Sequence, residues 1–208
     1  MKNTRGRHGV VASRGALTIV AVLIATIVSG CTATAAPMAL STTVPVGAGI
    51  VPTTGSAHPL FLVGDEYGEE LPAGTVRGWD QNVLGSPVVS DPSGTHSFAV
   101  PAGATAVATF ISPRGQETNL KAWDAYGQLE LIPAGVQMPN LKLSANTEAG
   151  SGSPSGTAAV AKTGGDYSLG IAFLNSSNQV VEADFTFITV VPDDTAAKAT
   201  WTWAVPAS

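Results

Sequence analysis

The stretch that decides the fold is 165–187, GDYSLGIAFLNSSNQVVEADFTF, in which apolar side chains recur at every second position on both sides of a polar tetrapeptide. Alternation with a period of two predicts β-strands at 167–173 and 181–187, and the tetrapeptide 175–178, NSSN, suits the turn between them. We therefore expect an antiparallel hairpin that turns its aromatic face inward. Its other, polar face is expected to carry Glu182, Asp184 and Thr186.

Short apolar runs separated by Gly and Pro continue this pattern along the chain. The last of them, 200–205, places Trp201, Trp203 and Val205 on one side, where we expect them in the core. No segment after residue 31 has the periodicity of a helix of ten or more residues. The fold class we expect is therefore all-β, an antiparallel β-sandwich of immunoglobulin-like or jelly-roll type. Further strands are expected at 60–63, 97–100, 105–111, 119–123, 129–132, 141–143 and 157–161, with turns at 101–103 and 124–127.

Two segments resemble known β-domains. The run 97–105, SFAVPAGAT, continuing to 120–124, LKAWD, resembles the start of bacterial pre-peptidase C-terminal jelly-roll modules. That resemblance implies an accessory domain of a secreted hydrolase, which binds or assists rather than catalyses. The run 165–173, GDYSLGIAF, together with the closing 201–203, WTW, is similar to C-terminal domains of uncharacterised secreted actinobacterial proteins. That resemblance implies export and a β-fold, and it implies no activity.

The N-terminus has the pattern of a bacterial export signal. A basic leader is followed by the 13 residues 16–28, which are too few to cross a bilayer, where about 20 are needed, but fit the apolar region of a signal peptide. The tetrapeptide Val28-Ser29-Gly30-Cys31 resembles the lipobox of bacterial prolipoproteins, in which the cysteine thiol receives a diacylglycerol and a dedicated peptidase cuts before it. The resemblance implies a lipoprotein signal peptide over 1–30 and Cys31 as a lipid anchor to the extracytoplasmic face of the cell membrane.

A second interpretation of the N-terminus stays open. A plain secretory signal cleaved within 32–36 would remove Cys31 together with the signal. We favour the lipobox because the four positions and the length of the apolar run agree. Cys31 is the only cysteine in 208 residues, so it has no intramolecular disulfide partner.

Charge divides the chain at the same point. Four of the ten basic residues and none of the fifteen acidic residues precede Cys31, which leaves a formal charge of −9 on the remainder. A surface of that sign repels phosphate backbones, so no nucleic-acid partner is expected. We expect a flexible, charge-free linker rich in Ala, Thr, Pro and Gly at 31–57, and a single β-sandwich domain at 58–206. A first strand within 44–51 is the alternative for part of the linker.

The aromatic residues suggest a sugar-binding surface. Flat rings stack on pyranose faces while neighbouring carboxylates and amides hold the hydroxyl groups. Two tryptophans at expected strand ends have acidic neighbours, and the alternative for both is a packing role. The candidate ligand-binding residues are Trp79, Asp80, Trp123, Asp124 and Tyr126.

Catalytic and metal-binding patterns are sparse. No Gly-x-Ser-x-Gly elbow occurs, and the mature part contains two isolated histidines, His58 and His96, which we expect at the surface or at a sheet edge. We therefore predict no catalytic residues, no cofactor and no zinc site, which needs three or four ligands. Loop carboxylates suit calcium, with a solvated acidic loop as the alternative. The calcium candidates are Asp65, Glu66, Glu69 and Glu70, with a second acidic pair at Asp193 and Asp194.

The function predicted from the sequence is a non-catalytic binding or adhesion module, tethered by lipid at the cell envelope, with a polysaccharide or protein ligand. The first alternative is a structural or assembly protein of the surface without a small ligand. The second is the hydrolase accessory domain implied by the jelly-roll resemblance.

Overall fold

The computed structural model describes residues 55–64, 67–129 and 135–205, and all of them belong to one compact unit. Cys31, the predicted signal peptide and all but the last three residues of the predicted linker lie outside the described residues. The described part is built mainly of antiparallel strands with one short α-helix, which confirms the all-β, sandwich-like fold class.

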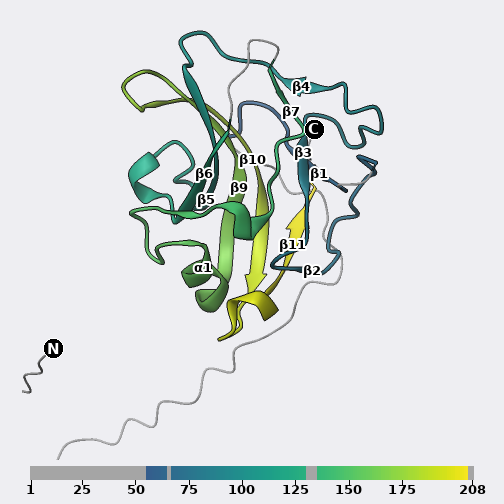
Figure 1. The fold of residues 1–208 in the computed structure, drawn as a ribbon, viewed down its shortest axis with the longest axis vertical. Coiled ribbons are helices and arrows are strands. Elements are labelled where there is room, and N and C mark those ends of the chain that lie inside the picture. Colours follow the sequence, from purple (N-terminus) through teal and green to yellow (C-terminus); the bar gives the residue numbers. More distant parts are fainter. Residues whose placement is uncertain (1–54, 65–66, 130–134, 206–208) are drawn as a thin grey trace, which may run out of the picture. The chain divides into compact units, whose positions relative to one another are not determined.

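A curled seven-stranded antiparallel sheet forms the centre of the fold (Figure 1). Its long strands are β9 (Gly165–Leu174) and β10 (Val180–Val191), and its edges are two-residue strands. In spatial order the strands are β2 (Arg77–Gly78), β11 (Thr200–Ala204), β10, β9, β5 (Ala106–Pro113), β6 (Ala125–Leu129) and β8 (Glu148–Ala149).

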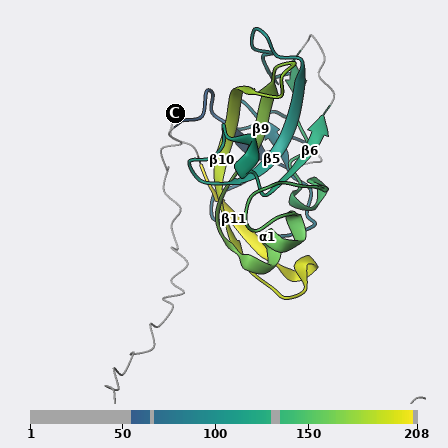
Figure 2. The same ribbon diagram turned by 90° about the vertical axis from the view of Figure 1, so that its left-hand side faces the viewer.

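Two small sheets and several short helices complete the described fold. One sheet pairs β1 (Phe61–Val63) with β3 (Leu84–Ser86), and the other pairs β4 (Ser97–Phe98) with β7 (Val136–Gln137). The α-helix α1 (Thr157–Thr163) packs beside the end of β10 (Figure 2). The 3-10 turns are η1 (Leu120–Ala122), η2 (Leu143–Ala145) and η3 (Ala196–Lys198).

The hairpin predicted at 165–187 is confirmed as β9 and β10, which pair from Gly165 with Val190 to Leu174 with Val180. The register shifts between Val180 and Glu182, so Val181 lies in an irregularity and is 42% exposed. The prediction of a polar outer face was wrong, because Asp184 and Thr186 are fully buried. Both faces of the hairpin are covered by other parts of the chain, which a period-two pattern alone does not reveal.

The two faces of the central sheet carry two separate apolar clusters. Along β5, Val107 and Ile111 belong to the larger cluster, which also holds Trp201 and Trp203 as predicted. Ala108 and Phe110, which point to the opposite side, belong to the smaller cluster. The smaller cluster, called the aromatic face below, is centred on Phe110, Trp123 and Phe185.

Gly170 makes the close packing of the aromatic face possible. It lies directly opposite Phe110 on one neighbouring strand and Phe185 on the other. Those two rings meet edge to face with centroids 6.4 Å apart. A Cβ atom at Gly170 would collide with the carbonyl oxygen of Asp184 and with Phe185, so this position requires a glycine.

Three predicted strands were wrong, among them 141–143, which runs into the turn η2. Residues 157–161 are not extended but form most of α1, because an Ala-rich run has high helix propensity and Val160 and Ala161 bury one side of the helix. Gly164, with φ of +64°, ends that helix. Residues 120–122 form the turn η1 instead of a strand, and β6 begins at Ala125, inside the predicted turn.

β11 pairs with only one end of β10. The remaining part of the same β10 edge is covered by the segment 55–60, called the N-terminal strap below. Ala57 donates its backbone N–H to Ala183 at 3.0 Å, and Pro59 forms a parallel bridge with Phe185. The strap includes the last three residues of the predicted linker. It brings residue 58 beside residues that lie more than 120 positions later in the chain.

Candidate functional site

A shallow groove lies on the aromatic face, where β5 and β6 meet the turn of the β9–β10 hairpin. We call it the β6 groove, and its volume is about 370 Å³, within the size range of ligand-binding pockets. Its polar side chains are one cation, two amides, a hydroxyl and a phenol, with no acidic residue among them. The apolar lining includes Ala106, Ala108, Leu120 and Leu174, and the polar lining is Lys121, Tyr126, Gln128, Ser151 and Asn178.

Packing fixes the aromatic side of this groove. Trp123 stacks on Phe110 with ring centroids 4.7 Å apart and an angle of 12° between the planes, and its indole N–H donates to the carbonyl of Glu117 at 2.9 Å. Tyr126, half-buried, lies 6.4 Å from Trp123 between centroids. Tyr126 therefore presents the accessible aromatic surface of the groove.

The two predicted sugar-stacking tryptophans do not form a platform. Trp79 is 3% exposed and Trp123 is 0% exposed, and they belong to different apolar clusters. Stacking on a sugar requires an open ring face, which neither indole has. The sugar-stacking prediction for these two rings was therefore wrong, and the alternative of a packing role describes them correctly.

The acidic neighbours of the two tryptophans are also separated from each other. Asp80 is a surface residue, 61% exposed, with Lys142 at 3.8 Å. Asp124 is fully buried, neither of its carboxylate oxygens has a hydrogen-bond partner, and burial raises its pKa to about 6. Of the five candidate residues, the structure brings only Trp123 and Tyr126 together in the groove.

Only half of the predicted calcium loop can be placed. Asp65 and Glu66 lie outside the described residues, while Glu69 and Glu70 are exposed. A carboxylate oxygen of Glu69 accepts the backbone N–H of Tyr67 at 3.3 Å, which is a local turn contact. Asp193 likewise accepts the backbone N–H of Thr195 at 2.7 Å. These contacts are those of ordinary acidic turns.

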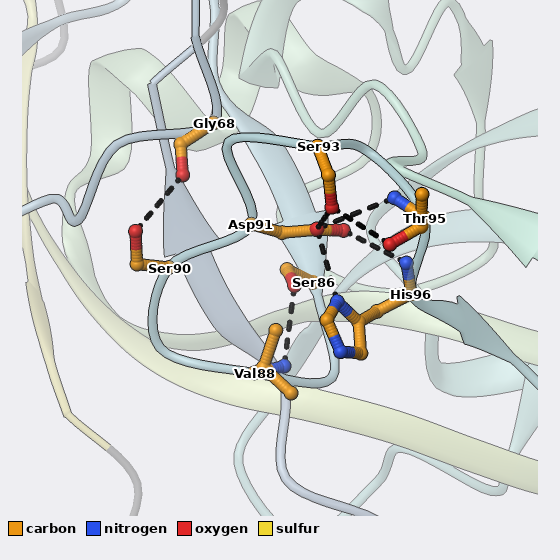
Figure 3. Close-up of polar contacts among 8 residues, drawn as sticks. All are labelled: Gly68, Ser86, Val88, Ser90, Asp91, Ser93, Thr95 and His96. Carbon is orange, nitrogen blue, oxygen red and sulfur yellow. Dashed lines mark hydrogen bonds and ion pairs between the residues drawn. The ribbon is translucent and has the colours of Figure 1, made fainter.

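His96 forms a histidine–aspartate pair in the loop before β4 (Figure 3). Asp91 is buried, and its Oδ1 accepts His96 Nδ1–H at 2.9 Å and the Ser93 hydroxyl at 3.0 Å. The backbone N–H groups of Thr95 and His96 also donate to this carboxylate. The pKa of Asp91 lies below its usual value, chiefly because its carboxylate accepts a hydrogen bond from the His96 side chain. All these donors lie within five residues of Asp91 in the sequence, so the pair stabilises the conformation of this one loop.

A second histidine pair joins distant parts of the chain. His58 on the N-terminal strap lies with its Nδ1 3.3 Å from Glu182 Oε1 and 3.3 Å from Asp184 Oδ1. Asp184 is buried with an unpartnered Oδ2, and burial raises its pKa to about 6. From the sequence, His58 was expected to be an isolated residue at the surface or at a sheet edge, because its partners lie far away in the chain. The one sequence signal for this cluster was the spacing of Glu182 and Asp184, which places both carboxylates on the same face of a strand.

Comparisons with known proteins add no relative: no protein-family model, no curated protein and no solved structure matches this chain. Within the described residues, none of the helices has the length and apolar character needed to cross a membrane.

Proposed function

We propose that the protein is exported, anchored to the membrane by lipid on Cys31, and acts as a non-catalytic binding module of the cell envelope. The lipobox-like tetrapeptide and the division of charge at residue 31 support the anchor. The β6 groove carries the binding part of the proposal, because it is the hollow on the described surface where an aromatic ring, amides and a cation converge.

A protein segment is the ligand that this groove fits best. Both indoles are buried, so Tyr126 alone presents accessible aromatic surface in the groove, and a single half-buried ring is a poor stacking platform for a polysaccharide. Small side chains along β5 leave room for an apolar side chain of a partner, and the rim offers Gln128, Ser151 and Asn178 for hydrogen bonds to a backbone. Lys121 gives the rim a positive charge on a chain that is otherwise strongly acidic, which favours a partner with a carboxylate at that position.

The anchor is tested by the Cys31→Ala variant expressed in a bacterial host with lipoprotein processing. The wild-type protein is expected to enter the detergent phase in Triton X-114 partitioning, since two acyl chains give stable membrane attachment. The variant is expected to stay in the aqueous phase. Detergent partitioning of the variant equal to the wild type would contradict the lipid anchor.

The groove is tested by site-specific photocrosslinking in intact cells. A photoreactive residue at Gln128, exposed on β6, is expected to give one defined protein adduct, which the additional change Tyr126→Ala should reduce at least tenfold. The same photoreactive residue at Gln81, exposed beside β2, is the matched control and should give no such adduct. Identical adducts at both positions, or none at Gln128, would rule out the groove as the binding surface.

A further inference from the structure

We propose that His58, Glu182 and Asp184 form a binding site for a divalent transition-metal cation of the zinc class. Glu182 and Asp184 are two residues apart on β10, so both side chains leave the same face of the strand. His58 comes from the N-terminal strap, which runs parallel to β10 at this point. The site lies apart from the β6 groove and is independent of the proposed function.

The spacing of the three groups fits one cation. A tetrahedral zinc with bonds of about 2.0–2.1 Å holds its ligand atoms roughly 3.3–3.4 Å apart. His58 Nδ1 lies 3.3 Å from Glu182 Oε1 and 3.3 Å from Asp184 Oδ1. One ligand atom from each of the three residues lies within 4.8 Å of the other two. Both distances from the histidine to the carboxylates therefore match the edge length of a zinc tetrahedron.

Asp184 supplies an independent indication of a missing partner. Its side chain is 1% exposed, and its Oδ2 has no hydrogen-bond partner. A buried carboxylate oxygen without a partner is unfavourable, and a cation bound by both oxygens of this carboxylate would satisfy it. Its Oδ1 already accepts the backbone N–H of His58 at 2.8 Å. Such a hydrogen bond is the outer-shell support that metal-binding carboxylates have.

The other histidine pair shows what a purely structural pair looks like in this protein. Asp91 has the same degree of burial as Asp184, but both of its oxygens accept hydrogen bonds from Ser93, Thr95 and His96. That carboxylate needs no further partner. His96 therefore provides a matched control for His58, because the exposed fractions of the two histidine side chains are 53% and 57%.

The chemistry of the donors selects the class of cation. Imidazole with carboxylates suits zinc and its neighbours, whereas calcium and magnesium prefer oxygen ligands alone. Among the described residues, neither carboxylate forms an ion pair with lysine or arginine, so their negative charge remains available. The Glu182 side chain is 20% exposed and His58 more so, which leaves a path for the cation and for water as the fourth ligand.

A cation at this site would join the N-terminal strap to the central sheet. The strap precedes β1 and is held to β10 by few contacts, among them the hydrogen bond of Ala57 and the Pro59 bridge. The ligands are 124 and 126 residues apart in the chain, so they converge only in the folded state. Binding would therefore stabilise the folded protein.

The experiment is a zinc titration of the tag-free full chain carrying Cys31→Ala, stripped with a chelator, so that no thiol competes for the metal. Isothermal titration calorimetry is expected to give one zinc per chain. At a zinc concentration of about 100 times Kd, the midpoint of thermal unfolding should rise by about 5–10 °C. Cobalt(II) should show the intense visible bands of a four-coordinate ion. Calcium chloride is the comparison cation.

Variants decide which side chains bind. His58→Ala, at an exposed position, and Glu182→Gln should each weaken zinc binding at least tenfold and abolish the cobalt spectrum, while His96→Ala should leave both unchanged. Asp184→Asn should also weaken zinc binding at least tenfold and abolish the cobalt spectrum. Circular dichroism checks that this variant is folded. The proposal is overturned if zinc gives neither heat nor a thermal shift, if His58→Ala binds zinc as tightly as His96→Ala, or if calcium binds more tightly than zinc.

Discussion

Replacing Asp124 by asparagine is expected to stabilise this protein at neutral pH. Asp124 has no exposed surface, and neither carboxylate oxygen has a hydrogen-bond partner. Its backbone is well satisfied, because its N–H donates to Ile111 and its carbonyl accepts from Gly150 and Gly156. These backbone contacts hold residue 124 in place, so its carboxylate stays buried although this burial lowers the stability of the folded state.

The size and pH dependence of this effect follow from the pKa. Burial raises the pKa of Asp124 from 3.8 to about 6, so between these values the folded state holds a proton that the unfolded state has released. Stability therefore falls as pH rises from about 4 to about 6 and stays lower above that range. The difference between the two pKa values corresponds to about 3 kcal/mol before solvent screening is considered. We expect Asp124→Asn to gain about 1–2 kcal/mol at pH 8.

The assay is urea unfolding followed by circular dichroism at pH 8 and pH 4. Asp124→Asn should have the higher midpoint at pH 8, and the gain should shrink to less than a third at pH 4, where the wild-type carboxyl is protonated in the folded state. Asp80→Asn, which changes an exposed carboxylate, should alter the midpoint little at either pH. A lower midpoint for Asp124→Asn at pH 8, or a gain independent of pH, would refute this reasoning.

Three further predictions concern packing and the Asp91 loop. Gly170→Ala should destabilise the fold by more than about 2 kcal/mol, because the added methyl group meets the backbone of Asp184 and Phe185. Thermal unfolding measures this loss, and Gly78→Ala is the control. The Cβ added at Gly78 has only ordinary contacts, so that variant should unfold at the wild-type midpoint. Trp123→Leu should cost about 3 kcal/mol through loss of the stack on Phe110, and an unchanged unfolding midpoint would contradict the packing role of this ring. Asp91→Asn should lower the urea midpoint at pH 7, because hydrogen bonds led by the His96 side chain hold the pKa of Asp91 below its usual 3.8 in the folded state. That contribution is lost as the folded-state carboxylate protonates, so the deficit should shrink as the pH falls below 3.8. A deficit that grows on acidification would contradict this reasoning.

Local sequence patterns predicted the parts of the fold in which neighbouring residues interact. The hairpin of β9 and β10 and the tryptophan strand β11 were predicted because alternation with a period of two is read directly from consecutive residues. The helix α1 and the turn η1 were missed because short apolar segments are compatible with strand or helix, and contacts with the rest of the fold decide between them.

The candidate sites depended more strongly on tertiary structure. Chemical type suggested that Trp79 and Trp123 could bind a ligand, yet both indoles are buried, on opposite faces of one sheet. Only Tyr126 of the predicted aromatic set presents accessible surface in the β6 groove. Which aromatic residues remain accessible depends on how the sheet curls and on which segments cover it, and neither is encoded in the neighbourhood of a single tryptophan.

The sequence by itself determined the all-β class and the central hairpin, and it gives the predictions of export and of an anchor at Cys31. All of these depend on short-range order: alternation along a strand, the length of one apolar run, and four consecutive residues. Only the tertiary structure decided that His58 meets Glu182 and Asp184, because the N-terminal strap pairs with β10 across 126 residues. The physical reason is that ligand geometry is a property of distances in space, and antiparallel folds bring together residues whose separation in the sequence carries no signal.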